Sequence, residues 1–65
     1  MKINLKVVVG DITTLYHTLY DMLGVESKID HDTLVFTIKP NQYSILKTIM
    51  DMYDMQGKKL LILPE

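Results

Sequence analysis

The chain is 65 residues long, carries a formal net charge of −1 and contains no cysteine. This length allows a single domain spanning residues 1–65, and the lack of cysteine excludes disulfides, zinc–thiolate sites and thiol nucleophiles. All seven basic residues are lysine, so the bidentate guanidinium contacts that read phosphates and guanine edges are missing. Apolar residues make up 48% of the chain, which is enough for a hydrophobic core.

The residue usage also bears on source and location. Arginine and alanine are absent while lysine, isoleucine and aspartate are frequent, a bias that suggests an AT-rich coding sequence from a low-GC bacterium or one of its phages. No apolar run approaches the ~20 residues needed to span a bilayer, and the first residues lack the apolar region of a signal peptide. We therefore expect a cytoplasmic protein that does not enter a membrane.

The first half of the chain predicts a strand followed by a helix. Apolar residues alternate with others over 3–9, which is typical of a half-buried strand. Gly10 ends this pattern, Asp11 is a good helix N-cap, and Gly24 occupies the position of a C-terminal capping glycine. The helix between them carries its apolar stripe on Ile12, Leu15, Tyr16, Leu19, Met22 and Leu23.

The second half predicts two strands, a second helix and a last strand. The runs 25–30 and 33–39 are joined by a turn at Asp30-His31-Asp32, with Val25, Ser27, Ile29, Leu34, Phe36 and Ile38 directed inward. Pro40 ends the second run, and a helix over 41–56 follows, with its core stripe on Ile45, Leu46, Ile49, Met50 and Tyr53. Gly57 ends this helix, and 58–63 forms the last strand.

This β-α-β-β-α-β order resembles the split β-α-β, ferredoxin-like plan. The resemblance implies an α+β fold in which both helices cover one face of a four-stranded antiparallel sheet. Right-handed crossovers would place strands 3–9 and 33–39 in the centre and strands 25–30 and 58–63 at the edges. If 25–30 is only a loop, the sheet has three strands.

Sites for chemistry are not indicated. The Gly10-Asp11 junction lacks the further glycines and the lysine of a phosphate loop, so Asp11 is interpreted as a helix cap. The Asp30-His31-Asp32 run and His17 have no metal-ligand spacing, and we expect a turn rather than a metal site. No spacing assembles a nucleophile, a base and an orienting group, so we expect neither catalysis nor a cofactor.

Nucleic-acid binding is also not expected. RNA-recognition domains share this order of elements, but their central strands expose aromatic side chains flanked by basic residues. Here Phe36 shares a face with Leu34 and Ile38, which points it into the core. The negative net charge and the absence of arginine remove the electrostatic attraction to phosphates.

Two surfaces remain as candidates for protein contact. The sheet face opposite the helices would carry Val8, Val35, Thr37 and either Leu60 and Ile62 or Leu61 and Leu63; we take Leu60 and Ile62 as contact residues. The edge strand 58–63 could also pair with a partner. The second surface is the back of helix 41–56, where Met52 and Met55 fall near Asn41, Ser44 and Thr48, with Asp51 beside them. The sequence thus favours a homodimeric, non-enzymatic protein-interaction module that regulates or inhibits a larger cellular or phage assembly.

A second reading belongs to another functional class. The order of elements is similar to that of ACT-type regulatory domains, which bind amino acids at dimer interfaces near the first strand–helix loop. That resemblance implies a ligand beside Gly10, Asp11 and Ile12. ACT-type domains are usually attached to the enzyme that they regulate. A stand-alone chain of this length departs from that arrangement.

Overall fold

A computed structural model describes residues 1–64 of the chain. Its elements in order are β1 (Lys2–Val9), α1 (Ile12–Leu23), β2 (Lys28–Asp30), β3 (Thr33–Thr37), the 3-10 helix η1 (Pro40–Gln42), α2 (Tyr43–Met55) and β4 (Lys59–Leu63). The predicted α+β class, with a four-stranded antiparallel sheet and two helices, is confirmed. Neither helix in the described part of the chain is long and apolar enough to cross a membrane.

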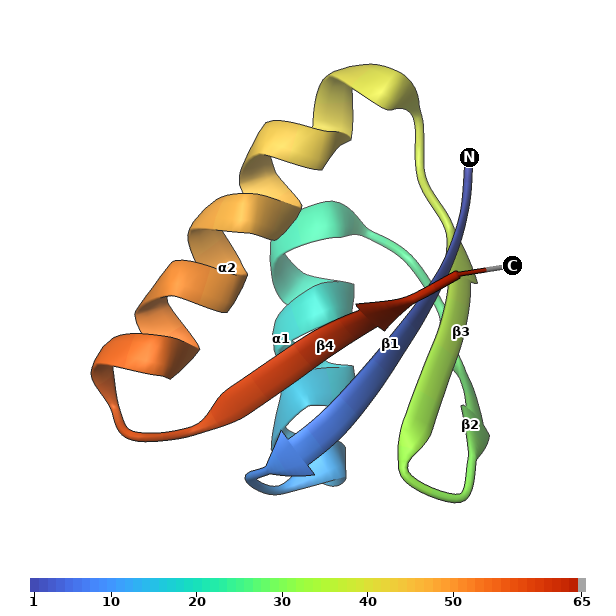
Figure 1. The fold of residues 1–65 in the computed structure, drawn as a ribbon. Coiled ribbons are helices and arrows are strands. Elements are labelled where there is room, and N and C mark those ends of the chain that lie inside the picture. Colours follow the sequence, from blue (N-terminus) through green and yellow to red (C-terminus); the bar gives the residue numbers. More distant parts are fainter. Residues whose placement is uncertain (65) are drawn as a thin grey trace.

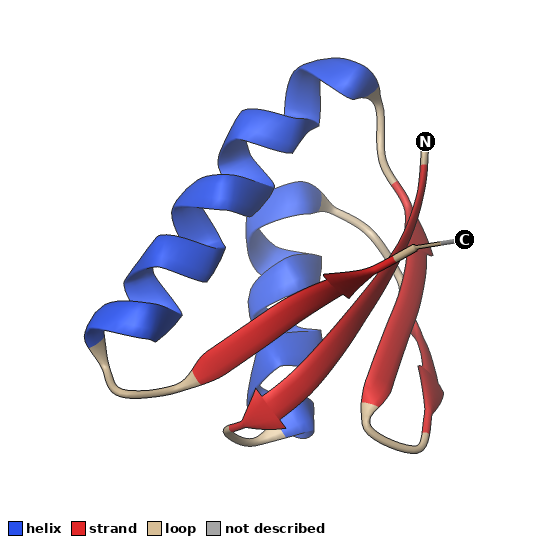
Figure 2. Cartoon of the chain, in the orientation of Figure 1, coloured by secondary structure: helices blue, strands red, loops and turns tan. Residues whose placement is uncertain are grey.

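The four strands lie in the order β2-β3-β1-β4, and every neighbouring pair is antiparallel. Both α-helices pack against the same face of this sheet, and no helix of residues 1–64 covers the other face (Figure 1). The strand layer and the helix layer are seen separately when coloured by secondary structure (Figure 2). The fold is therefore a two-layer structure whose core lies between one sheet face and two helices.

The ends of α1 follow from the residues at its boundaries. An Asp11 carboxylate oxygen accepts a 2.9 Å hydrogen bond from the backbone N–H of Thr13, which satisfies one of the free donors in the first turn. Gly24 ends the helix with a φ of 67°, and its N–H donates to the carbonyl of Tyr20. This left-handed conformation favours glycine because it has no Cβ. Both predicted caps are confirmed.

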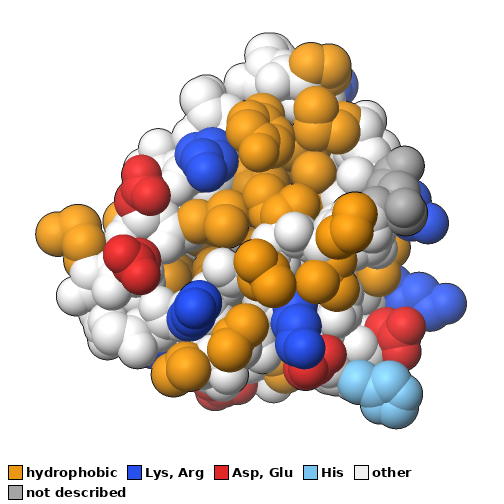
Figure 3. Space-filling view, in the orientation of Figure 1, with side chains coloured by type: hydrophobic (Ala, Val, Ile, Leu, Met, Phe, Trp, Pro, Cys, Tyr) orange, Lys and Arg blue, Asp and Glu red, His pale blue; other side chains and the backbone are white. Residues whose placement is uncertain are grey.

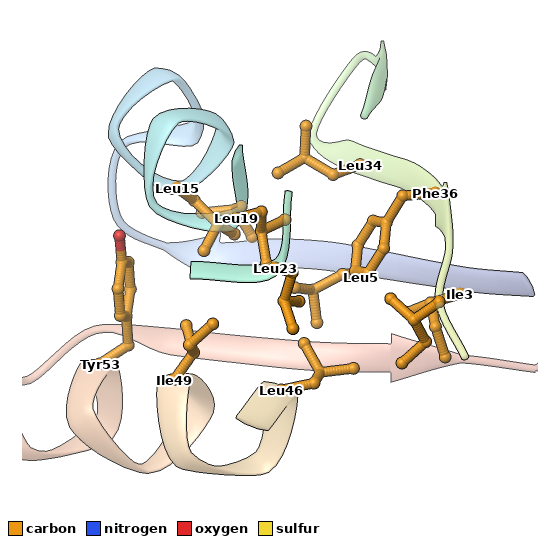
Figure 4. Packing of buried hydrophobic residues seen from close by; sticks show 12 residues of the cluster. Ile3, Leu5, Leu15, Leu19, Leu23, Leu34, Phe36, Leu46, Ile49 and Tyr53 are labelled. Carbon is orange, nitrogen blue, oxygen red and sulfur yellow. The ribbon is translucent and has the colours of Figure 1, made fainter. Parts of the chain in front are cut away.

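The buried core is built from hydrophobic side chains contributed by β1, β3 and both α-helices, with Ile38 just after β3 (Figure 4). The sheet contributes Ile3, Leu5 and Val7 from β1 and Leu34, Phe36 and Ile38 from β3 and the residue that follows it. The helices contribute Leu15, Leu19 and Leu23 from α1 and Leu46, Ile49 and Tyr53 from α2. Phe36 is buried, as its alternation with neighbouring residues predicts. The Tyr53 hydroxyl shares a 3.1 Å hydrogen bond with the Thr18 hydroxyl, so its polar end has a partner between the helices.

The buried stripes of the helices are narrower than the sequence predicts. Met22 is 43% exposed and Ile45 is 37% exposed, although the sequence predicts both in core stripes. A helix in a two-layer domain buries only the strip of surface that faces the sheet and the neighbouring helix. Met22 and Ile45 lie at the flanks of that strip, so their apolar character does not reflect full burial.

The strand predicted over 25–30 is shorter in the structure, where β2 comprises only Lys28–Asp30. Val25 packs against the core instead, so the chain at this point is still crossing from the helix layer to the sheet. Ile29 pairs with Leu34 and shares its face of the sheet, but it is 49% exposed. β2 lies at the edge of the sheet, where the helices do not cover it fully. Ile29 therefore faces the helix side of the sheet without being buried.

Replacing Leu19 with alanine should lower the free energy of unfolding by about 2–5 kcal/mol, because the side chain is fully buried and would leave a cavity. Met22→Ala is the matched control in the same helix, and it should cost less than about 1 kcal/mol because 43% of Met22 is already exposed. Urea denaturation followed by circular dichroism measures both values. Equal losses for the two variants would contradict this description of the core.

Candidate interaction surfaces

The sheet face opposite the helices is partly apolar. Asn4 of β1 lies between Val35 of β3 and Leu63 of β4. Lys6 of β1 lies opposite Leu61 of β4. Val8 and Leu61 are exposed, while Val35 and Leu63 are partly covered. Asn4 and Lys6 interrupt the apolar residues, and the Lys6 Nζ lies 3.8 Å from an Asp32 carboxylate oxygen. This face therefore carries separate apolar side chains between polar ones.

The assignment of Leu60 and Ile62 to this outer face is wrong. Leu60 pairs with Val7 and Ile62 pairs with Leu5, and both partners point into the core. Leu60 and Ile62 accordingly pack against the core from the helix side of the sheet. Leu61 and Leu63 are the residues of β4 on the outer face. The sequence could not distinguish the two pairs, because four consecutive apolar residues show no alternation.

The backbone hydrogen bonds of β1 show which way its peptide groups point. The Val7 N–H donates to the Asp32 carbonyl over 2.8 Å, and the Ile38 N–H donates to the Met1 carbonyl over 2.9 Å. Successive residues of a strand direct their N–H and C=O groups to opposite edges. Odd-numbered residues of β1 therefore bond to β3, whereas Asn4 and Lys6 bond to β4.

The same reasoning orients the backbone of β4. Leu61 and Leu63 lie opposite Lys6 and Asn4, so their N–H and C=O groups point toward β1. The alternate residues, Leu60 and Ile62, must then direct their N–H and C=O groups away from the sheet. No strand within residues 1–64 lies on that side of β4. The edge of β4 thus presents backbone donors and acceptors that could pair with another strand.

The opposite edge of the sheet is less suited to pairing. β2 is only three residues long, and the charged residues Lys28 and Asp30 begin and end it. Short length and charged side chains are two of the features by which natural sheets discourage edge-to-edge association. β4 has five residues, and every one after Lys59 is apolar. The two edges of this sheet are therefore unequal, and β4 is the open one.

Apolar side chains also border the open edge on its helix side. In the space-filling view, hydrophobic side chains form a nearly continuous band along the junction of α2 and β4 (Figure 3). Met50 of α2 and Leu60 and Ile62 of β4 are only partly buried against the core, and Tyr43 at the start of α2 is exposed. A strand docked along β4 would find backbone partners at the edge and apolar contacts beside it.

The back of α2 is exposed, as predicted. Met52, Met55, Thr48 and Asp51 are all exposed, and Met55 reaches 87%. The Thr48 hydroxyl donates to the Ser44 carbonyl over 3.0 Å, which satisfies it within the helix. These residues form a convex helix surface with flexible side chains and acidic neighbours. Such a surface can make contacts, but it has no backbone groups to offer.

The Gly10-Asp11-Ile12 segment is occupied by internal contacts. One Asp11 carboxylate oxygen accepts from the Thr13 N–H, and the other accepts from the Thr14 hydroxyl over 3.2 Å. Ile12 packs against the core. A shallow concave region with a volume of about 620 Å³ lies at the other end of β1, lined by Met1, Leu23, Gly24, Val25, Thr37, Ile38, Lys39, Pro40 and Gln42. None of the three residues proposed to hold a ligand lines this region.

The Asp30-His31-Asp32 segment forms the turn between β2 and β3. His31 has a φ of 56°, is fully exposed, and its Nε2 lies 3.9 Å from an Asp30 carboxylate oxygen. Within residues 1–64 there is no group of three or more histidine, cysteine, aspartate or glutamate side chains arranged to hold a metal ion. The predicted turn is confirmed.

Comparison of the chain with protein-family models, with curated proteins and with solved structures gives no match. We therefore infer the function from the geometry of this chain.

Replacing Asp11 with alanine should lower the free energy of unfolding by about 1 kcal/mol, because the first turn of α1 loses its side-chain acceptor. Asp11→Ser keeps a capping oxygen and should recover most of that loss. Thermal and urea denaturation measure both variants. A stability that is unchanged in Asp11→Ala would show that the carboxylate contributes nothing as a cap and would reopen a ligand-binding role for this segment.

Proposed function

We propose that this chain is a non-enzymatic protein-interaction module that binds an extended protein segment along β4. One observation carries the proposal: Leu60 and Ile62 direct their backbone N–H and C=O groups away from the sheet at an edge with no covering strand in residues 1–64. An added strand would satisfy these groups through ordinary ladder hydrogen bonds. Affinity would come from the backbone pairing, and selectivity from the side chains beside it.

The side chains around β4 support this mode of binding. An incoming strand places alternate side chains on the two faces of the sheet. On the helix side they would meet the partly buried Leu60 and Ile62, and on the outer side they would meet Leu61, which is 47% exposed. Both faces of the edge are thus apolar, and association would remove this surface from water.

The proposed architecture is the ferredoxin-like split β-α-β fold. In that plan each β-α-β unit has a strand of the other unit inserted between its own two strands, which leaves the second and fourth strands at the edges. The order β2-β3-β1-β4 is compatible with it. Such a domain acts by occupying a partner's surface, and a regulator or inhibitor of a larger cellular or phage assembly is the role we propose.

The two other surfaces receive less support. The back of α2, with Met52 and Met55, offers side-chain contacts only and serves as the comparison in the experiment below. The ACT-like alternative requires a ligand beside Gly10 and Asp11, where both carboxylate oxygens of Asp11 already accept hydrogen bonds within the chain.

Ile62→Pro should abolish binding of protein partners through β4, because proline removes an outward N–H from the edge while leaving the β1–β4 ladder intact. Ile62→Ala is the matched control: it shortens the same side chain but keeps the N–H, and it should retain most binding. The measurement is quantitative mass spectrometry of proteins captured by each purified variant from lysate of the source cell, with circular dichroism to verify folding.

A variant with Met52 and Met55 both replaced by glutamate tests the competing surface. Binding through β4 predicts that this variant captures the same proteins as the unaltered chain. If the glutamate variant loses its partners while Ile62→Pro keeps them, the contact surface is the back of α2 and the proposal for β4 is wrong.

A further inference from the structure

We propose that the strand received by β4 is the β4 of a second copy of this chain, paired antiparallel about a two-fold axis at Leu61. This inference rests on the proposed use of β4 as a binding edge and names the partner. In such a dimer the two four-stranded sheets join into one continuous sheet, with all four helices on the same face. The same surface of each copy meets itself, which is how closed homodimers form.

The backbone directions select this register. In an antiparallel pair, the residues that exchange hydrogen bonds are those whose peptide groups point at the partner strand. For β4 these are Leu60 and Ile62, so Leu60 of one copy should lie opposite Ile62 of the other, twice by symmetry. This arrangement forms about four backbone hydrogen bonds and satisfies every outward group of both residues.

The neighbouring registers are less favourable. Centring the axis on Ile62 places Leu60 opposite Pro64, which has no N–H to donate. Centring it on Leu60 places Ile62 opposite Lys58, outside the strand, and brings the two copies of Lys59 to about 7 Å apart along the ladder. In the Leu61-centred register the two copies of Lys59 are about 14 Å apart along the ladder. Each Lys59 then lies opposite Leu63 of the other copy.

The side chains of β4 fit a second copy on both faces. On the outer face, Leu61 of one copy meets Leu61 of the other at the axis, which covers a leucine that is otherwise about half exposed. On the helix side, Leu60 and Ile62 of each copy become neighbours and complete the covering of residues that the monomer leaves partly buried. A chain of this size has a thin stability margin, and burial of this kind is a common way to increase it.

Pairing through β4 also explains why association would stop at two copies. A dimer of this kind uses both β4 edges and leaves only β2 at the outer edges of the joined sheet. β2 has three residues, bounded by Lys28 and Asp30 on its outer face, and offers little to a further chain. Lys59 and Pro64 flank the four apolar residues of β4 and confine the pairing to this strand.

The test uses single cysteines, because the chain has none of its own. Leu61→Cys should form a disulfide-linked dimer rapidly and nearly completely under mild oxidation with oxidised glutathione. At the axis the two Cα atoms are about 4.5 Å apart, within disulfide range. Lys59→Cys and Leu63→Cys should each cross-link poorly alone but efficiently when mixed, because only the mixture places two cysteines opposite each other. Non-reducing electrophoresis gives the yields.

Val35→Cys and Met55→Cys are the controls. In the proposed dimer Val35 is separated from its counterpart by five strand spacings, roughly 24 Å, so Val35→Cys should not form a disulfide between the two copies. Met55, on the exposed back of α2, should also fail to link. Efficient linking of Val35→Cys would instead indicate two copies packed through their outer sheet faces, and it would overturn the proposed pairing.

Light scattering of the unaltered chain completes the test. We expect about twice the chain mass of 7.5 kDa, reduced to one chain mass by Ile62→Pro but not by Ile62→Ala. A monomer at millimolar concentration would overturn the self-pairing. The use of β4 as a binding edge is tested separately. It is supported if Ile62→Pro loses captured partners that Ile62→Ala keeps, and it is wrong if both variants capture the same proteins.

Discussion

The central position of β1 is the constraint on which this structure depends. β1 is paired on both edges, with β3 on one side and β4 on the other, and its inward residues Ile3, Leu5 and Val7 contact the core. Leu5 is fully buried and lies in one cross-strand row with Leu34 and Ile62. Both helices pack over that row. Without β1 in the middle, α1 and α2 would have no common surface to cover.

The same constraint produces the open edge. β1 uses its odd-numbered peptide groups on β3 and its even-numbered groups on β4, so each edge strand is bonded along one side only. A bulge at Val8, between the pairs Val7–Leu60 and Val9–Lys59, marks the end of the regular ladder. The outward groups of Leu60 and Ile62 thus follow from the register of the sheet. The proposed function and the proposed dimer both use these groups, because they are what the fold leaves unsatisfied within the described residues.

Local patterns predicted the elements and most of the core. Asp11 and Gly24 bound α1 as expected, and the alternation of Leu34, Phe36 and Ile38 correctly placed three core side chains. The errors in predicted burial have a common cause. Met22, Ile45 and Ile29 are apolar residues at inward positions, yet each lies where the other layer does not extend far enough to cover it. Periodicity gives the direction of a side chain, but the amount of cover depends on the size and position of the opposing layer.

The sequence by itself determined the order of elements, the caps of α1, the turn between β2 and β3, and the exposure of Met52 and Met55 on the back of α2. These features depend on residues close together in the chain. Only the tertiary structure decided whether Leu60 and Ile62 or Leu61 and Leu63 face the core, because the four consecutive residues are all apolar and show no alternation. The register against β1 fixed that choice, and with it the residues whose backbone groups point outward. The candidate surface could therefore not be located from the sequence, since it is defined by pairing between residues 50 or more positions apart.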